Sequence, residues 1–365
     1  MRIVFLMPPL QMAGGIKVVV IYAKAFVARG HEVILISPPH KSMSLYHRFR
    51  RFLREKSWPS NATLRPSQLD ESGLDSRILE CHRPILESDV PNADVVIATW
   101  WETAEWVNAL PKRCGEKVYF IQHHEIFPYL PIERCHATYR MPMHQVVIAK
   151  WLENVMRNDY GSKNVDLVEN SVDRDQFYAD TRGKNTVPTV GFLYSSASFK
   201  GVEVTIEAVK SLRKLFPDLR IISFGSERVS GQLRLPVGTE YMYRPRQSDI
   251  RNIYARCDVW ISASRTEGFN LPVLEAMACR TPVVSTKAGW PLQAIVTGYN
   301  GALVEVDDIS AIVSAVHNIL SAENSVWQTM SHNALATSAI GSWRESAEKL
   351  ELILSGLLKN KLQYE

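Results

Sequence analysis

Residues 264–285 read SRTEGFNLPVLEAMACRTPVVS and contain two glutamates, Glu267 and Glu275, eight positions apart. The first follows an apolar run of strand length at 258–262, so we expect it in a loop after a buried strand. The second lies in the segment 271–279, which we expect to be the helix that this loop opens. Gly268 lets the backbone approach a ligand closely, and Pro272 suits the first turn of a helix. The stretch therefore predicts a strand, a loop, a helix and a further strand at 282–285.

The chemistry of this loop has two readings. A carboxylate can accept two hydrogen bonds from a vicinal diol such as ribose, and backbone N–H groups at a helix start can hold hydroxyls or phosphate oxygens. Alternatively, Glu267 and Glu275 are surface glutamates near a helix N-terminus, where the helix dipole favours negative charge. The two glutamates alone do not decide between these readings.

Outward from this stretch, strands alternate with helices, and we read this as two doubly wound α/β domains of parallel sheet with a cleft between them. The chain turns polar between about 170 and 188, where we place the domain boundary. Ligands in such sheets bind beyond the carboxyl ends of the strands. The expected strands are at 2–7, 31–37, 94–99, 117–122, 146–149, 165–168, 189–193, 219–225, 258–262 and 282–285, and the expected helices at 16–29, 201–215, 271–279, 311–320 and 344–358.

Length and composition exclude several classes of protein. The chain has 365 residues, 46% hydrophobic and 22% charged, with a formal net charge of +4. These values are ordinary for a globular protein of about two domains and argue against a disordered chain or a nucleic-acid partner. We expect no transmembrane helix, because no apolar window is long enough. The five cysteines are an odd number without a C-x-x-C pair, which favours reduced thiols in the cytoplasm.

Basic residues are concentrated at 41–56, where six Lys and Arg interleave with aromatic and apolar side chains. Phe49, Phe52 and Leu53 are three and four positions apart and would share one face of a helix. This segment is either a solvated surface helix or a peripheral contact with an anionic membrane or a phosphate-bearing acceptor. The second reading would place the protein on the inner face of the membrane.

The string 267–284 resembles the signature of GT4 retaining glycosyltransferases, E-G-F-G-L-P-x-L-E-A-M-A-C-G-x-P-V-V, with Asn270 and Arg280 in place of two glycines. Asn tolerates a left-handed backbone, so Asn270 can keep the loop shape. The resemblance extends over nearly the whole chain and implies the GT-B fold. Its other parts are Gly14-Gly15, the motif Arg29-Gly30-His31-Glu32-Val33, Asn170 to Phe177, and Phe199-Lys200-Gly201.

By this resemblance, residues 1–180 would form an acceptor-binding domain and 181–342 a nucleotide-sugar-binding domain, with 343–365 crossing back to the first. Lys200 would neutralise the donor diphosphate, Glu267 would lie beside the donor sugar, and Glu275 would hold the ribose. No metal or other cofactor is expected. The catalytic residues implied are Glu267, Lys200 and the histidine after the strand at 117–122, which is His123 first and His124 second. His124 is otherwise a possible sugar or acceptor contact. The remaining donor contacts implied are Gly14, Gly15, Ser196, Gly268, Phe269, Asn270 and Leu271.

One departure concerns the diphosphate site. The family has an arginine directly after the first strand of its second domain, and Phe192 stands at that position here. We expect hydroxyls of Ser195, Ser196 or Ser198 to compensate, or Arg265 to reach in as a second cation.

Other conspicuous residues have structural readings beside the functional ones. Asp173-Arg174-Asp175 has the form of a metal–diphosphate motif but lies in the connector between the domains, so we expect no metal there. Trp100 and Trp101 follow a strand end, where their rings can stack on a sugar or fill the core. His123 and His124 point to opposite faces if the backbone there is extended.

These observations predict a retaining hexosyltransferase that moves a sugar from a nucleotide-diphosphate donor to a glycan or lipid-linked acceptor, in surface polysaccharide or glycoconjugate synthesis. Two alternatives stay open. One is a protein of the same fold that binds ligands with little activity, which the change to Phe192 favours. The other is a nucleotide-sugar epimerase, which would consume the donor without an acceptor.

Overall fold

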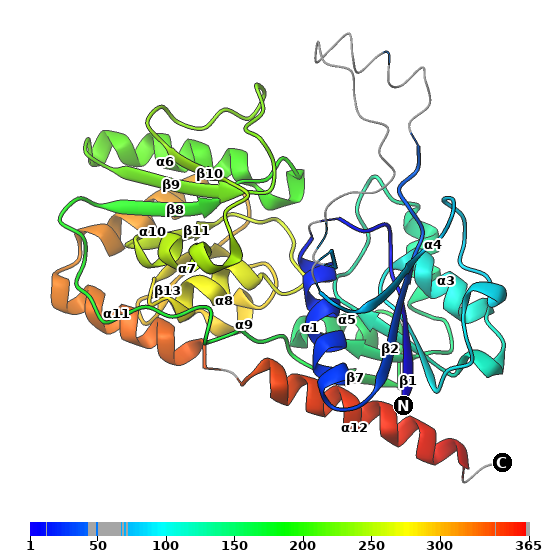
Figure 1. Ribbon diagram of the computed structural model, residues 1–365. Coiled ribbons are helices and arrows are strands. Elements are labelled where there is room, and N and C mark those ends of the chain that lie inside the picture. Colours follow the sequence, from blue (N-terminus) through cyan, green and yellow to red (C-terminus); the bar gives the residue numbers. More distant parts are fainter. Residues whose placement is uncertain are drawn as a thin grey trace. The chain divides into compact units, whose positions relative to one another are not determined.

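The computed structural model describes residues 1–11, 13–42, 49, 67, 69, 70, 72–339 and 341–362. Contacts within the chain divide it into two compact units (Figure 1). The first unit comprises Met1–Ile148, Leu152–Val168 and Ala347–Glu365, and the second comprises Ala149–Trp151 and Glu169–Ser346.

The first unit is built on a parallel sheet in the order β3-β2-β1-β4-β5-β6-β7. Its central strands are fully buried apolar runs, as expected for a sheet covered on both faces. The strands are β1 (Arg2–Leu6), β2 (Glu32–Ser37), β3 (Asp75–Ile78), β4 (Val95–Ala98), β5 (Glu116–Ile121), β6 (His144–Val147) and β7 (Val165–Leu167). The helices are α1 (Gly14–Ala28), α3 (Trp101–Ala109), α4 (Ile132–Thr138), α5 (Lys150–Asn158) and α12 (Trp343–Leu362), with η1 (Glu87–Asp89) and η2 (Lys112–Cys114) as short 3-10 turns.

The second unit has a parallel sheet in the order β10-β9-β8-β11-β12-β13. Side chains of β8, β9, β11 and the helices α6 and α10 form one hydrophobic core. The strands are β8 (Thr189–Leu193), β9 (Arg220–Gly225), β10 (Glu240–Tyr243), β11 (Val259–Ser262), β12 (Val283–Thr286) and β13 (Gly301–Val304). The helices are η3 (Ser198–Lys200), α6 (Val202–Leu215), α7 (Gln247–Ala255), α8 (Leu271–Ala278), α9 (Pro291–Ala294), α10 (Ile309–Ser321) and α11 (Asn324–Thr337).

These two sheets confirm the prediction of two doubly wound α/β domains. In each sheet the strand order reverses once, between β1 and β4 in the first unit and between β8 and β11 in the second. Ligands of open α/β sheets bind beyond the carboxyl ends of the strands at such a reversal. The loops that follow these four strands are therefore where a site is expected in each unit.

The helix α12 is joined to the first unit by the motif Arg29-Gly30-His31. The guanidinium of Arg29 pairs with Glu351 and, at 3.1 Å, with Glu348. The Nε2 atom of His31 lies 2.7 Å from the other oxygen of Glu351, and its Nδ1 atom lies 3.1 Å from the amino terminus of Met1. The helix α12 is thus held by residues that directly precede the strand β2.

Candidate functional site

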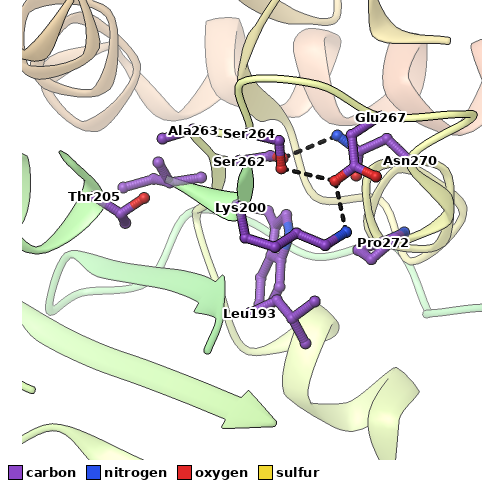
Figure 2. Close-up of a pocket in the computed structure, with 11 residues that line it drawn as sticks. Leu193, Lys200, Thr205, Ser262, Ala263, Ser264, Glu267, Asn270 and Pro272 are labelled. Carbon is purple, nitrogen blue, oxygen red and sulfur yellow. Dashed lines mark hydrogen bonds and ion pairs between the residues drawn. The ribbon is translucent and has the colours of Figure 1, made fainter. Parts of the chain in front are cut away.

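A pocket opens in the second unit where β8 and β11 end, at the reversal of the strand order (Figure 2). The loop after β8 supplies Lys200, and the loop after β11 supplies Ser264 and Glu267. The described residues that line the pocket are Leu193, Lys200, Thr205, Trp260, Ile261, Ser262, Ala263, Ser264, Glu267, Asn270 and Pro272.

Glu267 is held between a cation and a hydroxyl. Its Oε1 atom lies 2.7 Å from Lys200 Nζ and also accepts a 2.7 Å hydrogen bond from Ser264 Oγ. Only 7% of Glu267 is exposed, so the carboxylate is set in one orientation in a site largely shielded from water. Figure 2 shows the two interactions meeting on the same oxygen. The structure thus brings together two of the predicted catalytic residues, Lys200 and Glu267.

Asn270 begins the helix α8 in the left-handed conformation that its family glycine implied. Its φ is 80°, and its side-chain amide donates a 2.9 Å hydrogen bond to Ser262 Oγ. The second replaced glycine, Arg280, is also left-handed at a φ of 60°. The prediction that Asn270 preserves the loop shape is confirmed, and Gly268, Phe269 and Leu271 lie in the same turn.

Gly289 packs closely against the backbone of this turn. Its φ is +76°, and a Cβ atom there would lie 2.8 Å from Phe269 O and 2.9 Å from Glu267 Cβ. The next residue, Trp290, donates a backbone hydrogen bond of 2.8 Å to Phe269 O and stacks on the Phe269 ring at 5.6 Å. Sequence reasoning missed Gly289, although its place in the loop that follows the strand β12 was a usable signal.

Glu275 lies on α8 and is 7% exposed. Its Oε2 atom accepts a 2.9 Å hydrogen bond from the phenol of Tyr254, on the neighbouring helix α7. Both glutamates of the signature are therefore buried and hydrogen-bonded, which does not fit the reading of two solvated surface glutamates. Tyr254 is a second residue that sequence reasoning did not identify.

Phe192 is 1% exposed and belongs to the hydrophobic core, not to the pocket. Side chains alternate along a strand, so the next residue, Leu193, is the one that lines the pocket. Lys200 is consequently the one cation among the described residues that line it.

Two of the groups expected to replace the arginine, Arg265 and Ser196, are engaged elsewhere in this structure. Arg265 forms ion pairs with Glu203 at 2.6 Å and with Asp307 at 2.8 Å, and these acidic neighbours raise its pKa. The backbone N–H and the hydroxyl of Ser196 both donate to the carboxylate of Glu227, in the loop after β9. Neither residue lines the pocket.

In the first unit, the glycine pair begins α1 after the strand β1. Gly14 has open space around it, while a Cβ atom on Gly15 would lie 3.4 Å from the side chain of Gln122, directly before His123. The Oε1 atom of Gln122 is buried without a hydrogen-bond partner among the described residues. Gln122 is thus a candidate ligand contact that sequence reasoning missed, although it adjoins the histidines after β5.

The two histidines occupy different surroundings. The Nδ1 atom of His123 lies 2.9 Å from His124 O, and its ring packs on Phe127 at 4.8 Å. His124 points into a cluster with Tyr160, whose phenol lies 2.7 Å from its Nε2 atom, and with His136. Burial, with the neighbouring His136 and His123, lowers the pKa of His124 to about 4, so its ring is neutral at pH 7. This setting gives His124 a structural position and leaves His123 as the candidate.

Trp100 and Trp101 differ in their burial. Trp101 is buried at the start of α3, and the guanidinium of Arg134 lies 4.8 Å above its ring, whereas Trp100 is half-buried. The backbone N–H of Trp101 donates a 2.8 Å hydrogen bond to the buried carboxyl of Glu125, two residues after His123. Burial raises the pKa of Glu125 well above its usual range. The carboxyl of Glu125 therefore ties the loop after β4 to the loop after β5.

The other sequence candidates have plain outcomes. Asp173 accepts hydrogen bonds from the backbone N–H groups of Asp175 and Gln176, which closes a turn. The basic segment 41–56 lies, except for residues 41, 42 and 49, outside the described residues. In the described part of the chain, no helix is long and apolar enough to span a membrane.

Comparison with known proteins gives a family match in the second unit and partial matches to individual relatives. The family described as Glycosyl transferases group 1 matches residues 184–322. A D-inositol 3-phosphate glycosyltransferase of Corynebacterium urealyticum is 28% identical over 44% of this chain and 41% of its own length. A lipopolysaccharide core biosynthesis mannosyltransferase of Rhizobium leguminosarum is 44% identical over 19% of each chain. The matched part is thus less than half the length of either relative.

Solved structures match over the whole chain. The crystal structure of Anabaena HepE in complex with UDP-glucose superimposes with a TM-score of 0.75 at 15% identity, covering 98% of this chain and 100% of that one. At this identity the likeness shows the fold, which is the GT-B fold expected from the sequence. Residues 184–322 of this chain are therefore similar to group 1 glycosyltransferases, and the chain has the fold of the solved structure.

Proposed function

We propose that this protein is a retaining hexosyltransferase that uses a nucleoside-diphosphate sugar. The observation that carries the proposal is the ion pair between the half-buried Lys200 of η3 and the buried Glu267 of the loop before α8, with Glu275 on α8 itself. A cation and a helix N-terminus would receive the diphosphate, and two fixed carboxylates would accept hydrogen bonds from sugar and ribose hydroxyls. The match to group 1 glycosyltransferases supports this assignment.

The reaction follows from where charge develops. As the bond between the sugar carbon and the diphosphate oxygen breaks, negative charge grows on the leaving diphosphate. Lys200 and the first N–H groups of α8 stabilise that charge most in the transition state. The acceptor hydroxyl attacks the same carbon from the face that the diphosphate leaves, so the configuration is retained. Its proton passes to a diphosphate oxygen, and the charges balance without a protein nucleophile.

For the first unit we propose acceptor binding. Trp100 and Gln122 follow the strands β4 and β5, at the same edge of the sheet as Gly14, Gly15 and His123, which we expect to face the donor. We propose a glycan or lipid-linked acceptor in surface polysaccharide or glycoconjugate synthesis, at the cytoplasmic face of a membrane. The mannosyltransferase of lipopolysaccharide core biosynthesis among the relatives supports this class of acceptor.

A second candidate function is nucleotide binding with little turnover. It is favoured by one observation, that Lys200 is the one cation among the described residues lining the pocket. A nucleotide-sugar epimerase, which would convert the donor sugar to its epimer without any acceptor, is distinguished by the same experiment.

The test is a thermal-shift screen of the full chain with UDP, GDP, ADP and dTDP and their sugars. We expect one nucleotide to raise the melting temperature of the wild type but not of Glu275→Ala. Glu207→Ala, which removes an exposed glutamate of α6 in the same unit, is the matched control and keeps the shift. The nucleotide that binds then selects donors for transfer assays.

Three outcomes separate the readings. Donor turnover that requires an added acceptor supports the transferase. Donor consumption without an acceptor supports the epimerase, and a thermal shift without turnover supports the binding protein. No shift with any nucleotide contradicts the donor site itself.

A further inference from the structure

The phenol of Tyr254 donates a hydrogen bond to Glu275. Its hydroxyl lies 2.9 Å from Glu275 Oε2, and both groups are buried. Burial and the adjacent carboxylate raise the pKa of Tyr254 well above its usual range. The phenol therefore keeps its proton at neutral pH and acts as a donor toward this carboxylate.

The ring of Tyr254 cannot easily move. It meets Trp260 edge-on at 4.6 Å and Phe224 edge-on at 5.8 Å, and it packs on Phe177 at 6.2 Å. Its own carbonyl accepts a 2.7 Å hydrogen bond from Thr281. A hydroxyl held so firmly fixes the plane of the carboxylate that it binds.

We propose that Tyr254 is a positioning residue that sets Glu275 for the ribose diol and makes the site select ribonucleoside diphosphates over deoxyribonucleoside diphosphates. This inference rests on the proposed function, in which Glu275 holds the ribose. With Oε2 bound by the phenol, the carboxylate cannot turn to follow a sugar that lacks a hydroxyl. A deoxyribose offers the buried carboxylate of Glu275 one hydrogen-bond donor fewer. Part of the desolvation cost of that carboxylate is then uncompensated, and the deoxyribonucleotide binds more weakly.

A purely structural reading is that the Tyr254 hydroxyl only satisfies a buried carboxylate and stabilises the unit. The two readings differ in what the change Tyr254→Phe does to binding. If the hydroxyl is only structural, its loss weakens the binding of all nucleotides to the same extent. If it positions Glu275, its loss weakens the binding only of nucleotides whose sugar hydroxyls reach Glu275. The effect of Tyr254→Phe and the effect of removing the sugar hydroxyls are then not additive.

The experiment is a binding cycle on the full chain by calorimetry. The probes are whichever of UDP, GDP and ADP binds the wild type best and its 2′,3′-dideoxy counterpart. The wild type should prefer the ribonucleotide by roughly a hundredfold. In Tyr254→Phe, which keeps the ring, that preference should fall by roughly tenfold, with little change in the affinity of the dideoxy probe.

The matched control is Tyr194→Phe, which removes another buried phenol of the same unit, bonded at 3.0 Å to Leu233 O. It should leave the preference for ribose unchanged. Equal weakening of both probes by Tyr254→Phe, or an unchanged preference, overturns the inference while leaving the donor site in place. A wild type that binds no nucleotide overturns the proposed function, and the inference with it.

Discussion

Lys200 Nζ lies 2.7 Å from Glu267 Oε1, and the two residues are 67 positions apart in the chain. The pair joins the loop after β8 to the loop after β11, across the point where the strand order of the sheet reverses. The cation and the carboxylate thus neutralise each other at the place where a diphosphate and a sugar would enter. A ligand that binds there exchanges this pairing for its own phosphate and hydroxyl groups.

Removing the cation should affect turnover more than folding. We expect Lys200→Met to lower kcat by about 100- to 1000-fold, because the charge of the leaving diphosphate loses its one lysine partner in the pocket. Initial rates with saturating donor and acceptor measure this effect. Lys210→Met, which removes an exposed lysine of α6, is the control. A kcat for Lys200→Met within about threefold of the wild type would show that the diphosphate charge is balanced elsewhere.

The left-handed residue Asn270 gives a test of backbone strain. Asn270→Ala and Asn270→Gly both lose the hydrogen bond to Ser262, but alanine also pays for its Cβ at a φ of 80°. We expect the free energy of unfolding of the alanine variant to be lower than that of the glycine variant by about 1–2 kcal/mol. Urea unfolding measures the difference, and equal stabilities would show that the turn relaxes.

The buried carboxyl of Glu125 should make stability fall as pH rises. Since burial raises its pKa in the folded state above that in the unfolded state, the folded protein binds this proton more tightly. The stabilisation by protonated Glu125 is therefore fully present below the pKa of the unfolded state, about 4.3. It is lost as the pH rises toward the pKa of the carboxyl in the folded state.

Glu125→Gln removes that titration while keeping an acceptor for the N–H of Trp101. We expect the free energy of unfolding of Glu125→Gln, relative to wild type, to increase between pH 5 and pH 8 in urea titrations. Glu125→Ala should lose about 1–3 kcal/mol because the N–H is left unpaired. A pH-independent difference between glutamine variant and wild type would mean that Glu125 is ionised in the fold.

The contribution of Glu351 on α12 to stability should depend on pH in the opposite sense to that of Glu125. Burial alone would raise the pKa of Glu351, but hydrogen bonds from Arg29 and His31 and the charge of Arg29 outweigh it and lower the pKa. The stabilisation is therefore present above the unfolded pKa and is lost as pH falls through the folded value. The stability difference between wild type and Glu351→Gln should shrink from pH 6 to pH 3. Glu207→Gln, a surface glutamate of the second unit, corrects for the loss of one carboxylate.

The sequence was sufficient for the central strands and for the signature loop, because both leave patterns in the residues themselves. Continuous apolar runs such as those of β1 and β4 can only be buried, and an asparagine in a glycine position predicts a positive φ. The edge strand β3 was missed since its residues, Asp75–Ile78, are all exposed and show no alternation. At the edges of the second sheet, β13 was missed, and β10, whose residues are exposed or half-buried, was noted only as a strand-like run without bounds.

The side-chain partners in the site could not be predicted from spacing. Arg265 is close to Glu267 in sequence, yet it turns to Glu203 and Asp307. Tyr254 is 21 positions from Glu275 on another helix, and only the packing of α7 against its aromatic neighbours places the hydroxyl. Such contacts depend on rotamers that the surrounding core selects, and no local pattern encodes them.

The anchoring of α12 bears on the order in which the protein is made. The first unit takes its residues from both ends of the chain, whereas nearly all of the second is one continuous segment, Glu169–Ser346. During synthesis, the ribosome releases the strands of the first sheet long before the glutamates that meet Arg29 and His31. All strands of the second sheet are synthesised before α12. The first unit therefore lacks the helix α12 until the second unit has been translated.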